Sequence, residues 1–239
     1  MSDIIQLLPD HVANQIAAGE VVQRPASIVK ELLENAIDAR ATKIELIVEE
    51  AGRNLVRVVD NGSGMSETDA RMAFERHATS KIRSTEDIFH IATKGFRGEA
   101  LASIAAVAQV ELKTKKKDTD VGSVIYIEGG ELQFQEPVQT SEGSVFSVKN
   151  LFYNVPARRK FLKSNNIEFR HIIDEFQRVA LAHEALEFSL YQNDEVIFNL
   201  RKGSQMQRIV DIFGRKLQPL LVPIKEDLGW VKMHGFVGK

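Results

Sequence analysis

The sequence predicts an α+β fold: a mixed β-sheet covered by helices, followed by the start of a second, truncated α/β lobe. Three observations support this prediction. Segments rich in β-branched residues are interleaved with segments of helical periodicity, which is typical of a sheet with helices packed on it. The 239 residues, 44% of them hydrophobic, suffice for one large core. A new segment begins near Gly203, and one helix and one strand are expected after it.

The helices are predicted by their start signals and their apolar periodicity. Asp10 suits the N-cap of the first helix, and Pro25 suits the first turn of the second. Ser66 followed by Asp69 marks the start of the third helix, and an alanine-rich run follows Glu99. The expected helices are residues 10–18, interrupted by Gly19; 25–38; 66–77; 99–108; a short helix after Pro156; 167–183; and 204–213.

The strands are predicted by β-branched, partly alternating segments bounded by turn residues. Residues 51–54 read as the turn of a first hairpin, and Asn193-Asp194 as the turn of a later one. Residues 79–98 lack periodicity, so a long loop is expected there. The expected strands are 44–49, 55–60, 122–127, 132–136, 143–148, two arms within 186–200, and 230–237. We therefore expect one domain over residues 1–202 and the beginning of a second lobe over 203–239.

Composition excludes several classes of protein. With 31 basic and 33 acidic side chains the net charge is −2, so any contact with DNA should be weak or switched. The absence of cysteine excludes disulfides, thiolate metal sites and cysteine nucleophiles. No apolar run approaches the roughly 18 residues of a membrane span, and the N-terminus has no basic-then-apolar leader. A reducing, cytoplasmic location without membrane contact is expected.

Residues 30–38 form the most informative stretch of the chain. At about 100° per residue, Glu31, Glu34, Asn35 and Asp38 fall within one narrow stripe opposite a broad apolar face. Acids at this density repel one another unless a cation or solvent relieves them. The neutral oxygen of Asn35 beside carboxylates suits Mg²⁺. Taken alone, the stripe could hold a metal, polarise a water or form a solvated helix face, and the solvated face is the simplest interpretation.

Two glycine-containing segments could approach a ligand closely. Asp60 ends a predicted strand and leads into Asn-Gly-Ser-Gly-Met at residues 61–65; an ordinary turn is the alternative, but a helix follows it. Residues 94–101 carry glycines into a helix N-terminus, where free amides and the helix dipole favour phosphate. A plain loop is the alternative there. Neither segment is a P-loop or a dinucleotide fingerprint.

Basic residues suggest weaker possibilities. Lys81 could neutralise phosphate, although a surface lysine is the simpler reading, and His77 lacks a second histidine at metal-ligand spacing and is expected to be structural. The lysines at 113 and 115–117 are expected on an exposed loop. The basic run at 158–163 is expected either to face solvent or to pair with carboxylates. Neither cluster has aromatics placed for base stacking.

The order of these motifs resembles the GHKL ATP-binding fold, which gyrase-type topoisomerases, heat-shock chaperones, histidine kinases and MutL mismatch-repair proteins share. Several longer strings are similar to the N-terminal domain of MutL-type DNA mismatch-repair proteins, and the similarity covers nearly the whole chain. These strings are residues 13–22, 24–27, 76–82, 95–104 and 152–161.

The resemblance implies roles for individual residues. Glu31 resembles the general base that activates the attacking water, and Asn35 resembles the protein ligand of Mg²⁺. Asp60 matches the aspartate that binds the adenine amino group. The other nucleotide-binding positions that the resemblance implies are Asp38, Gly62, Gly64, Met65, Thr79, Lys81, the lid residues Gly95, Phe96, Arg97, Gly98, Glu99, Ala100 and Leu101, and Ser144, which stands where threonine is common in relatives.

The resemblance also implies an activity and partners. We expect a Mg²⁺-dependent ATPase in which ATP orders the lid and favours a homodimer of N-terminal domains. Its nucleotide state would control weak contacts with DNA, mismatch-recognition proteins and other repair proteins, in the cytoplasm and near the nucleoid in a bacterium. In this family a second-lobe lysine reaches the terminal phosphate. No residue here matches it, so we expect a truncated domain that hydrolyses ATP poorly.

Two other classes of function are open from the sequence. A DNA-binding scaffold could use the two basic clusters, although the near-neutral charge argues against this as the sole activity. A GHKL histidine kinase or chaperone would share the nucleotide site. Few residues precede the fold to carry a phospho-acceptor histidine, and a chaperone would leave the string at 95–104 unexplained.

Overall fold

The structure, a computed structural model, describes residues 7–81, 86–87, 93–95 and 98–239. Its main feature is an eight-stranded sheet in the order β5-β4-β3-β6-β2-β1-β7-β8. The strands are β1 (Lys43–Glu49), β2 (Leu55–Asp60), β3 (Gln109–Lys115), β4 (Gly122–Glu128), β5 (Glu131–Val138), β6 (Gly143–Lys149), β7 (Glu187–Gln192) and β8 (Glu195–Leu200). Because β1 and β7 are parallel while the other pairs are antiparallel, the sheet is mixed, as predicted.

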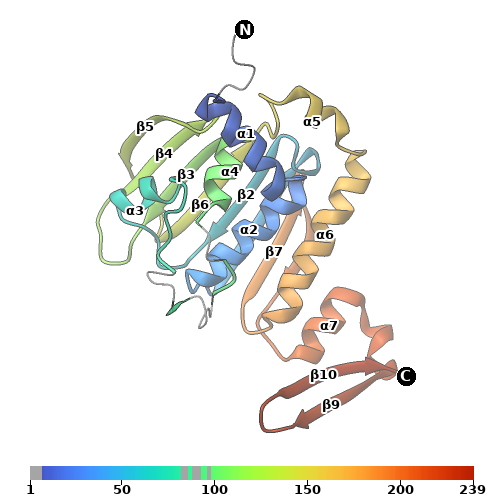
Figure 1. The fold of residues 1–239 in the computed structure, drawn as a ribbon. Helices are drawn as coiled ribbons and strands as arrows, with labels where there is room; N and C mark the ends of the chain where they lie inside the picture. Colours follow the sequence, from blue (N-terminus) through green and yellow to red (C-terminus); the bar gives the residue numbers. More distant parts are fainter. Residues whose placement is uncertain (1–6, 82–85, 88–92, 96–97) are drawn as a thin grey trace.

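Helices cover one face of this sheet, which confirms the α+β class (Figure 1). Those of the main body are α1 (Asp10–Val21), α2 (Pro25–Asp38), α3 (Glu67–Met72), α4 (Ala100–Val107), α5 (Pro156–Phe161) and α6 (Asn165–Ala182). Figure 1 shows α1, α2, α4 and α6 side by side over the strands. Among the described residues, no helix is long and apolar enough to span a bilayer.

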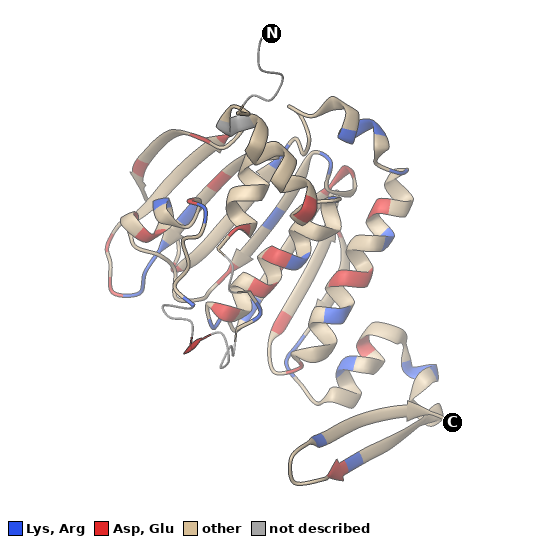
Figure 2. Cartoon of the chain, viewed as in Figure 1, with Lys and Arg blue, Asp and Glu red and all other residues tan. Residues whose placement is uncertain are grey.

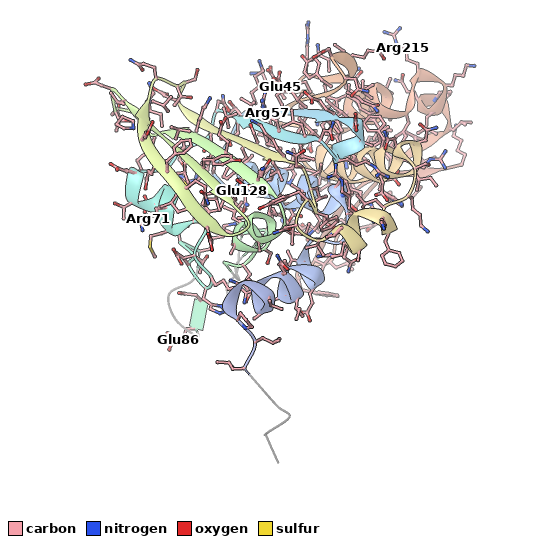
Figure 3. All side chains as sticks on the ribbon, turned by 90° about the horizontal axis from the view of Figure 1, so that it is seen from above. Glu45, Arg57, Arg71, Glu86, Glu128 and Arg215 are labelled. Carbon is pink, nitrogen blue, oxygen red and sulfur yellow. The ribbon has the colours of Figure 1, made fainter. Side chains whose placement is uncertain are left out.

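Alternation in the strands decides which face the helices cover. In β1, Ile44 and Leu46 are buried, whereas Glu45 between them points to the other face. In β2, Arg57 lies on that outer face and donates from Nε to the hydroxyl of Ser147 at 3.0 Å. Figure 3 shows Glu45 and Arg57 on the opposite side of the molecule from α1. The helical layer and the inner face of the sheet therefore enclose the core.

The apolar face of α2 packs into this core and leaves its polar stripe outside. Ile28, Val29, Leu32 and Leu33 are fully or almost fully buried against the sheet and α6. On α6, the Phe176 ring packs against the rings of Phe188 on β7 and Phe198 on β8. The core thus fixes the rotation of α2, and with it the direction in which the stripe points.

The remaining elements follow the last strand of the large sheet. They are α7 (Gln205–Phe213), a 3₁₀ helix at Arg215–Leu220, β9 (Leu221–Asp227) and β10 (Lys232–Gly238), and the two strands form a separate antiparallel hairpin. Ser204 caps α7 by accepting a hydrogen bond from the Gln207 amide at 3.2 Å. Figure 1 shows this part beside the end of α6.

Arg208 on α7 is almost fully buried and points back into the main body. Its Nη1 donates to the Ala180 carbonyl at 2.6 Å, and its Nη2 to the Leu186 carbonyl at 2.6 Å. Three more carbonyls lie within 3.4 Å of the guanidinium, those of His183, Glu184 and Arg201. Neutral carbonyls at the end of α6, just before β7 and just after β8 therefore hold this cation.

Several local predictions are wrong. Residues 109–115 form β3, so Lys113 and Lys115 lie on a strand and not on the expected loop, because Val110, Leu112 and Thr114 alternate inward. Lys116 and Lys117 follow the strand and are exposed, as expected. A second missed strand is β9. The first helix runs through Gly19 to Val21, with Pro9 at its N-cap position. The helix after Ser66 ends at Met72, five residues before the expected end.

Candidate functional site

One large cavity of about 1270 Å³ lies where α2, the end of β2 and the start of α4 meet. Most of the residues predicted to bind nucleotide line it: Glu31, Asn35, Asp38, Asp60, Gly64, Met65, Thr79, Lys81, Gly95, Gly98, Glu99, Ala100, Leu101 and Ser144. Gly62 is not part of the lining, although its amide donates to Asp60 Oδ1. Phe96 and Arg97 lie outside the described residues. The structure thus brings together side chains more than 100 residues apart in the sequence.

Asp60 forms one end of the cavity. It is the last residue of β2, it pairs with Ser144 of β6, and only 6% of it is exposed. Its Oδ1 accepts a hydrogen bond from the Gly62 amide at 2.8 Å. Burial raises the pKa of Asp60 to about 6, against the opposing effect of amide hydrogen bonds from Gly62 and Ser144. At neutral pH this buried carboxylate can accept a hydrogen bond from a ligand.

Thr114 ties three segments together beside Asp60, and sequence reasoning missed it. Its hydroxyl accepts from the Met65 amide at 2.9 Å, donates to the Gly143 carbonyl at 3.0 Å and lies 3.1 Å from the Ser144 hydroxyl. Thr114 belongs to β3, the strand that the sequence did not predict. Its inward place in the alternation of residues 110–114 is the signal that would have found it.

At Gly64 the backbone of the glycine turn packs directly against β3. Its φ is +61°, and a Cβ at this position would lie 2.0 Å from the Lys115 carbonyl oxygen. A backbone oxygen at that distance cannot yield without moving β3, so both the conformation and the space require glycine here. The sequence predicted close approach to a ligand, but the neighbour that the structure describes is the protein's own strand.

The polar stripe of α2 forms the opposite wall. Lys30 Nζ lies 3.5 Å from both a Glu31 and a Glu34 carboxylate oxygen. Although burial lowers it, these two carboxylates together raise the pKa of Lys30. A second lysine, Lys81, contacts the stripe from outside α2. Its Nζ lies 2.6 Å from Asp38 Oδ2 and 3.3 Å from Asn35 Oδ1. Two lysines therefore relieve the repulsion that the sequence predicted. Figure 2 shows acidic and basic segments together along α2.

The third wall joins residues 77–81 to the start of α4. The His77 amide donates to the Gly98 carbonyl at 3.1 Å, and His77 Nδ1 lies 3.4 Å from Glu99 Oε1. His77 also lines the cavity, and its side chain is 76% exposed. α4 begins at Ala100 on the cavity wall, and the first amides of a helix have no partner within the helix. These amides and the helix dipole make this wall suitable for an anion.

A metal site built from protein side chains alone is absent from the described part of the chain. It holds no group of three or more His, Cys, Asp or Glu residues placed for a metal ion. Asn35 lines the cavity, and its Oδ1 accepts a hydrogen bond from the Lys81 ammonium, so this oxygen already faces a cation. Mg²⁺ in proteins often takes one or two protein oxygens and completes its shell with phosphate and water. The donor set fits a Mg²⁺ that arrives with a phosphate ligand.

The two basic clusters, residues 113–117 and 158–163, differ in their relation to this site. Lys116 lines the cavity and lies 3.5 Å from an Asp69 oxygen. Arg158 is half-buried and pairs with no carboxylate of the described residues, in contrast to both expectations, whereas Arg159, Lys160 and Lys163 are exposed, as one of them proposed. It donates to the Val22 carbonyl at the end of α1, and its guanidinium lies 4.3 Å from the centre of the Phe152 ring. The position of Arg158 is therefore structural.

Comparisons with known proteins agree with this geometry. Residues 23–142 match the model of the family described as Histidine kinase-, DNA gyrase B-, and HSP90-like ATPase. The whole chain is 61% identical to the DNA mismatch repair protein MutL of Christiangramia forsetii and 62% identical to that of Flavobacterium psychrophilum. It spans 39% of the length of each of these relatives.

A solved structure extends the likeness to three dimensions. The Aquifex aeolicus MutL ATPase domain complexed with ADP is 29% identical, with a TM-score of 0.68 over 86% of this chain and 73% of that one. Its fold is the one that the sequence motifs indicated, and the family match begins just before α2 and includes the glycine turn and α4. The chain therefore belongs to the histidine kinase-, DNA gyrase B- and HSP90-like ATPase family, and within it to the MutL-type domains.

Proposed function

We propose that this chain binds ATP together with Mg²⁺ and hydrolyses it, as the nucleotide-driven switch of a DNA mismatch-repair protein. One observation carries the proposal. A single cavity brings the α2 stripe, the buried Asp60 and the N-terminus of α4 together, so that it offers a water-activating group, a base-binding group and an anion site. The names of the relatives and the family match support the same activity.

The adenine base would bind at the Asp60 end. The Asp60 carboxylate would accept a hydrogen bond from the adenine amino group. A hydrogen bond to a buried charged acceptor contributes on the order of 1.5–3 kcal/mol. The surrounding wall would come from the predicted residues Gly64, Met65, Thr79 and Ser144.

The phosphates would bind between α2 and the start of α4. Amides at residues 95–101 and the Lys81 ammonium would neutralise their charge, and Asn35 Oδ1 would be the protein ligand of Mg²⁺. When bound, Mg²⁺ supplies charge neutralisation to the phosphate oxygens. Phosphoryl transfer depends more on such positioning and neutralisation than on covalent chemistry by the protein.

Glu31 would act as the general base. It lies on the cavity wall one helical turn before Asn35, and its side chain is about three-quarters buried. A carboxylate here can orient a water and take its proton as the water attacks the terminal phosphate. Such a base contributes about 10²–10⁴-fold to a rate.

The proposal extends to the domain organisation and the partners. Residues 1–202 would form the ATP-binding domain and residues 203–239 the beginning of a second lobe. In the whole protein, ATP would favour a homodimer of these domains and control weak contacts with DNA and with mismatch-recognition and other repair proteins, in the cytoplasm. The similarity to proteins named DNA mismatch repair protein MutL supports these expectations.

Calorimetry and phosphate release test the core of this proposal. We expect the chain to bind ATP and release phosphate only with Mg²⁺. Glu31→Ala should bind ATP within about threefold of the parent yet lose at least about 100-fold in turnover. Asp174→Asn, on α6 and outside the cavity lining, is the control. Absence of ATP binding by the parent would refute the function, and equal turnover in Glu31→Ala would refute the base.

A further inference from the structure

Asp38, the last residue of α2, gathers three hydrogen-bond donors from two distant segments. Lys81 Nζ lies 2.6 Å from its Oδ2, and the Lys94 and Gly95 amides lie 3.1 and 3.5 Å from its two oxygens. The donors follow Asp38 in the sequence by 43, 56 and 57 residues. One carboxylate thereby connects the end of α2 to Lys81 and to the backbone at Lys94 and Gly95, all of which line the cavity.

This ion pair is more buried than the other pairs of the described chain that bond as closely. The Asp38 side chain is 10% exposed and that of Lys81 20%. Arg178 and Glu175 on α6 also approach to 2.6 Å, but there the arginine is 71% exposed. Charge-assisted hydrogen bonds gain strength as water is excluded, whereas exposed pairs contribute little.

The Lys81 ammonium is also fixed by a second acceptor. It lies 3.3 Å from Asn35 Oδ1, one turn earlier on α2, so it bridges two residues of the same stripe. Asn35 is neutral and cannot by itself hold the lysine in place by charge. The carboxylate of Asp38 is therefore the group that decides where this cation lies.

We propose that Asp38 is a positioning residue, which acts on the nucleotide through Lys81 and through the backbone at Lys94 and Gly95 rather than by contact with it. A bare carboxylate would repel a triphosphate, but one that holds an ammonium and two amides presents those donors at a fixed place. The inference rests on the proposed function and deepens it: Asp38 sets the affinity for the phosphate part of ATP, not for the base.

A second consequence follows for Asn35. In this structure the ammonium of Lys81 uses the same oxygen that would bind Mg²⁺. Binding of Mg²⁺ there requires the ammonium to leave Asn35, while Asp38 keeps it within reach of a phosphate. Asp38 thus lets Lys81 move from Asn35 to a phosphate without leaving the site.

A double-mutant cycle tests whether Asp38 acts through Lys81. The variants are Asp38→Asn, Lys81→Met and both together, with ATP, ADP and adenosine affinities measured by calorimetry. We expect each single variant to weaken ATP binding by about tenfold and to leave adenosine binding within about twofold. The double variant should be no weaker than the weaker single variant. Losses that multiply in the double variant, or an unchanged ATP affinity in Asp38→Asn, would overturn the proposal.

Amide exchange gives a readout that does not need ATP. In nucleotide-free Asp38→Asn, the Lys94 and Gly95 amides should exchange faster by about tenfold or more. Asp227→Asn, which removes the carboxylate that lies 3.2 Å from Lys232 Nζ on the β9–β10 hairpin, is the control and should leave both amides unchanged. If the parent did not bind ATP, the proposed function would be refuted. The amide-exchange rates would still show whether Asp38 holds the backbone at Lys94 and Gly95.

A charge-preserving variant guards against misfolding. Asp38→Glu moves the carboxylate outward by one methylene, so its ATP affinity should lie between those of the parent and Asp38→Asn. It carries the same measurements if Asp38→Asn does not fold. An ATP affinity equal to that of the parent in Asp38→Glu, with unchanged exchange at 94–95, would show that the exact position of the carboxylate does not matter and would overturn the proposal.

Discussion

The two ends of the cavity are built in different ways. At the Asp60 end, Asp60, Thr114 and Ser144 lie on paired strands, and the sheet register fixes their spacing. At the α2 end, Asn35, Asp38 and Lys81 come from a helix and a loop, and side-chain hydrogen bonds and charge pairing hold them together. The base end is therefore formed by the backbone ladder, while the phosphate end is assembled by charges that a nucleotide can exchange.

Two glycine variants offer the sharpest test of this contrast. Gly64→Ala should destabilise the protein by roughly 3 kcal/mol, because a Cβ would meet the Lys115 carbonyl at 2.0 Å and would strain the positive φ. Gly95→Ala should change stability by less than about 0.5 kcal/mol, because among the described residues the nearest atom to its Cβ is Lys81 Nζ at 3.5 Å. Denaturant unfolding measures both. Equal losses would mean that the two ends are equally rigid.

Asp60→Asn should separate stability from binding at the rigid end. The raised pKa means that ionised Asp60 costs folding free energy at neutral pH, so the variant should be more stable by on the order of 1–3 kcal/mol at pH 7.5. ATP affinity should fall by roughly 10- to 100-fold, because the amide places a donor opposite the adenine amino group. Unfolding and calorimetry measure the two effects. A variant that is less stable and binds ATP as well as the parent would contradict both.

The pH dependence of binding should come from the same carboxylate. With a pKa of about 6, only about a quarter of Asp60 is ionised at pH 5.5, so affinity for adenosine should fall about fourfold from pH 7.5 to 5.5. The stability of the folded protein should depend on pH in the opposite direction. A raised folded-state pKa contributes stability that is full below the unfolded-state pKa and is lost as pH rises through about 6. Asp60→Asn is the control and should show neither dependence.

Salt concentration should affect ligand binding differently at the two ends of the cavity, and this is the smallest of the expected effects. Raising NaCl from 50 to 500 mM should weaken ATP binding by about two- to fivefold, because added ions screen the phosphate contacts. Adenosine, which reaches only the base end, should change by less than about 1.5-fold. Equal salt dependence for the two ligands would mean that the charges at the α2 end do not set affinity.

The same contrast explains how far the sequence predicts the site. Asp60, Gly62 and Gly64 are close in the sequence, so their strand-and-turn motif is visible, and the α2 stripe follows from helical periodicity alone. The role of Thr114 was not predicted, because the lysines of residues 113–117 made the alternation of β3 read as an exposed loop. The contact of Asp38 with Lys81 spans 43 residues and leaves no local pattern. Only the folded chain shows that these charges meet.

The fold was predicted better than its boundaries. Buried apolar faces identify α2 and α6, and turn residues identify the β1–β2 and β7–β8 hairpins, because these signals are local. The end of the first helix was misplaced at Gly19, where packing of α1 against α4 outweighs the low helix propensity of glycine. The roles of Glu31 and Asn35 came from family resemblance, since a stripe of acids is by itself compatible with a wet surface.

Arg208 finally bears on what counts as one folding unit. Sequence composition divides the chain near residue 202, yet this guanidinium satisfies carbonyls at the end of α6 and in the two segments that follow it. A chain cut after residue 202 would leave those oxygens without their donor. We therefore expect that α7 melts together with the main body. A hinge between the main body and the residues that follow would therefore lie beyond residue 208.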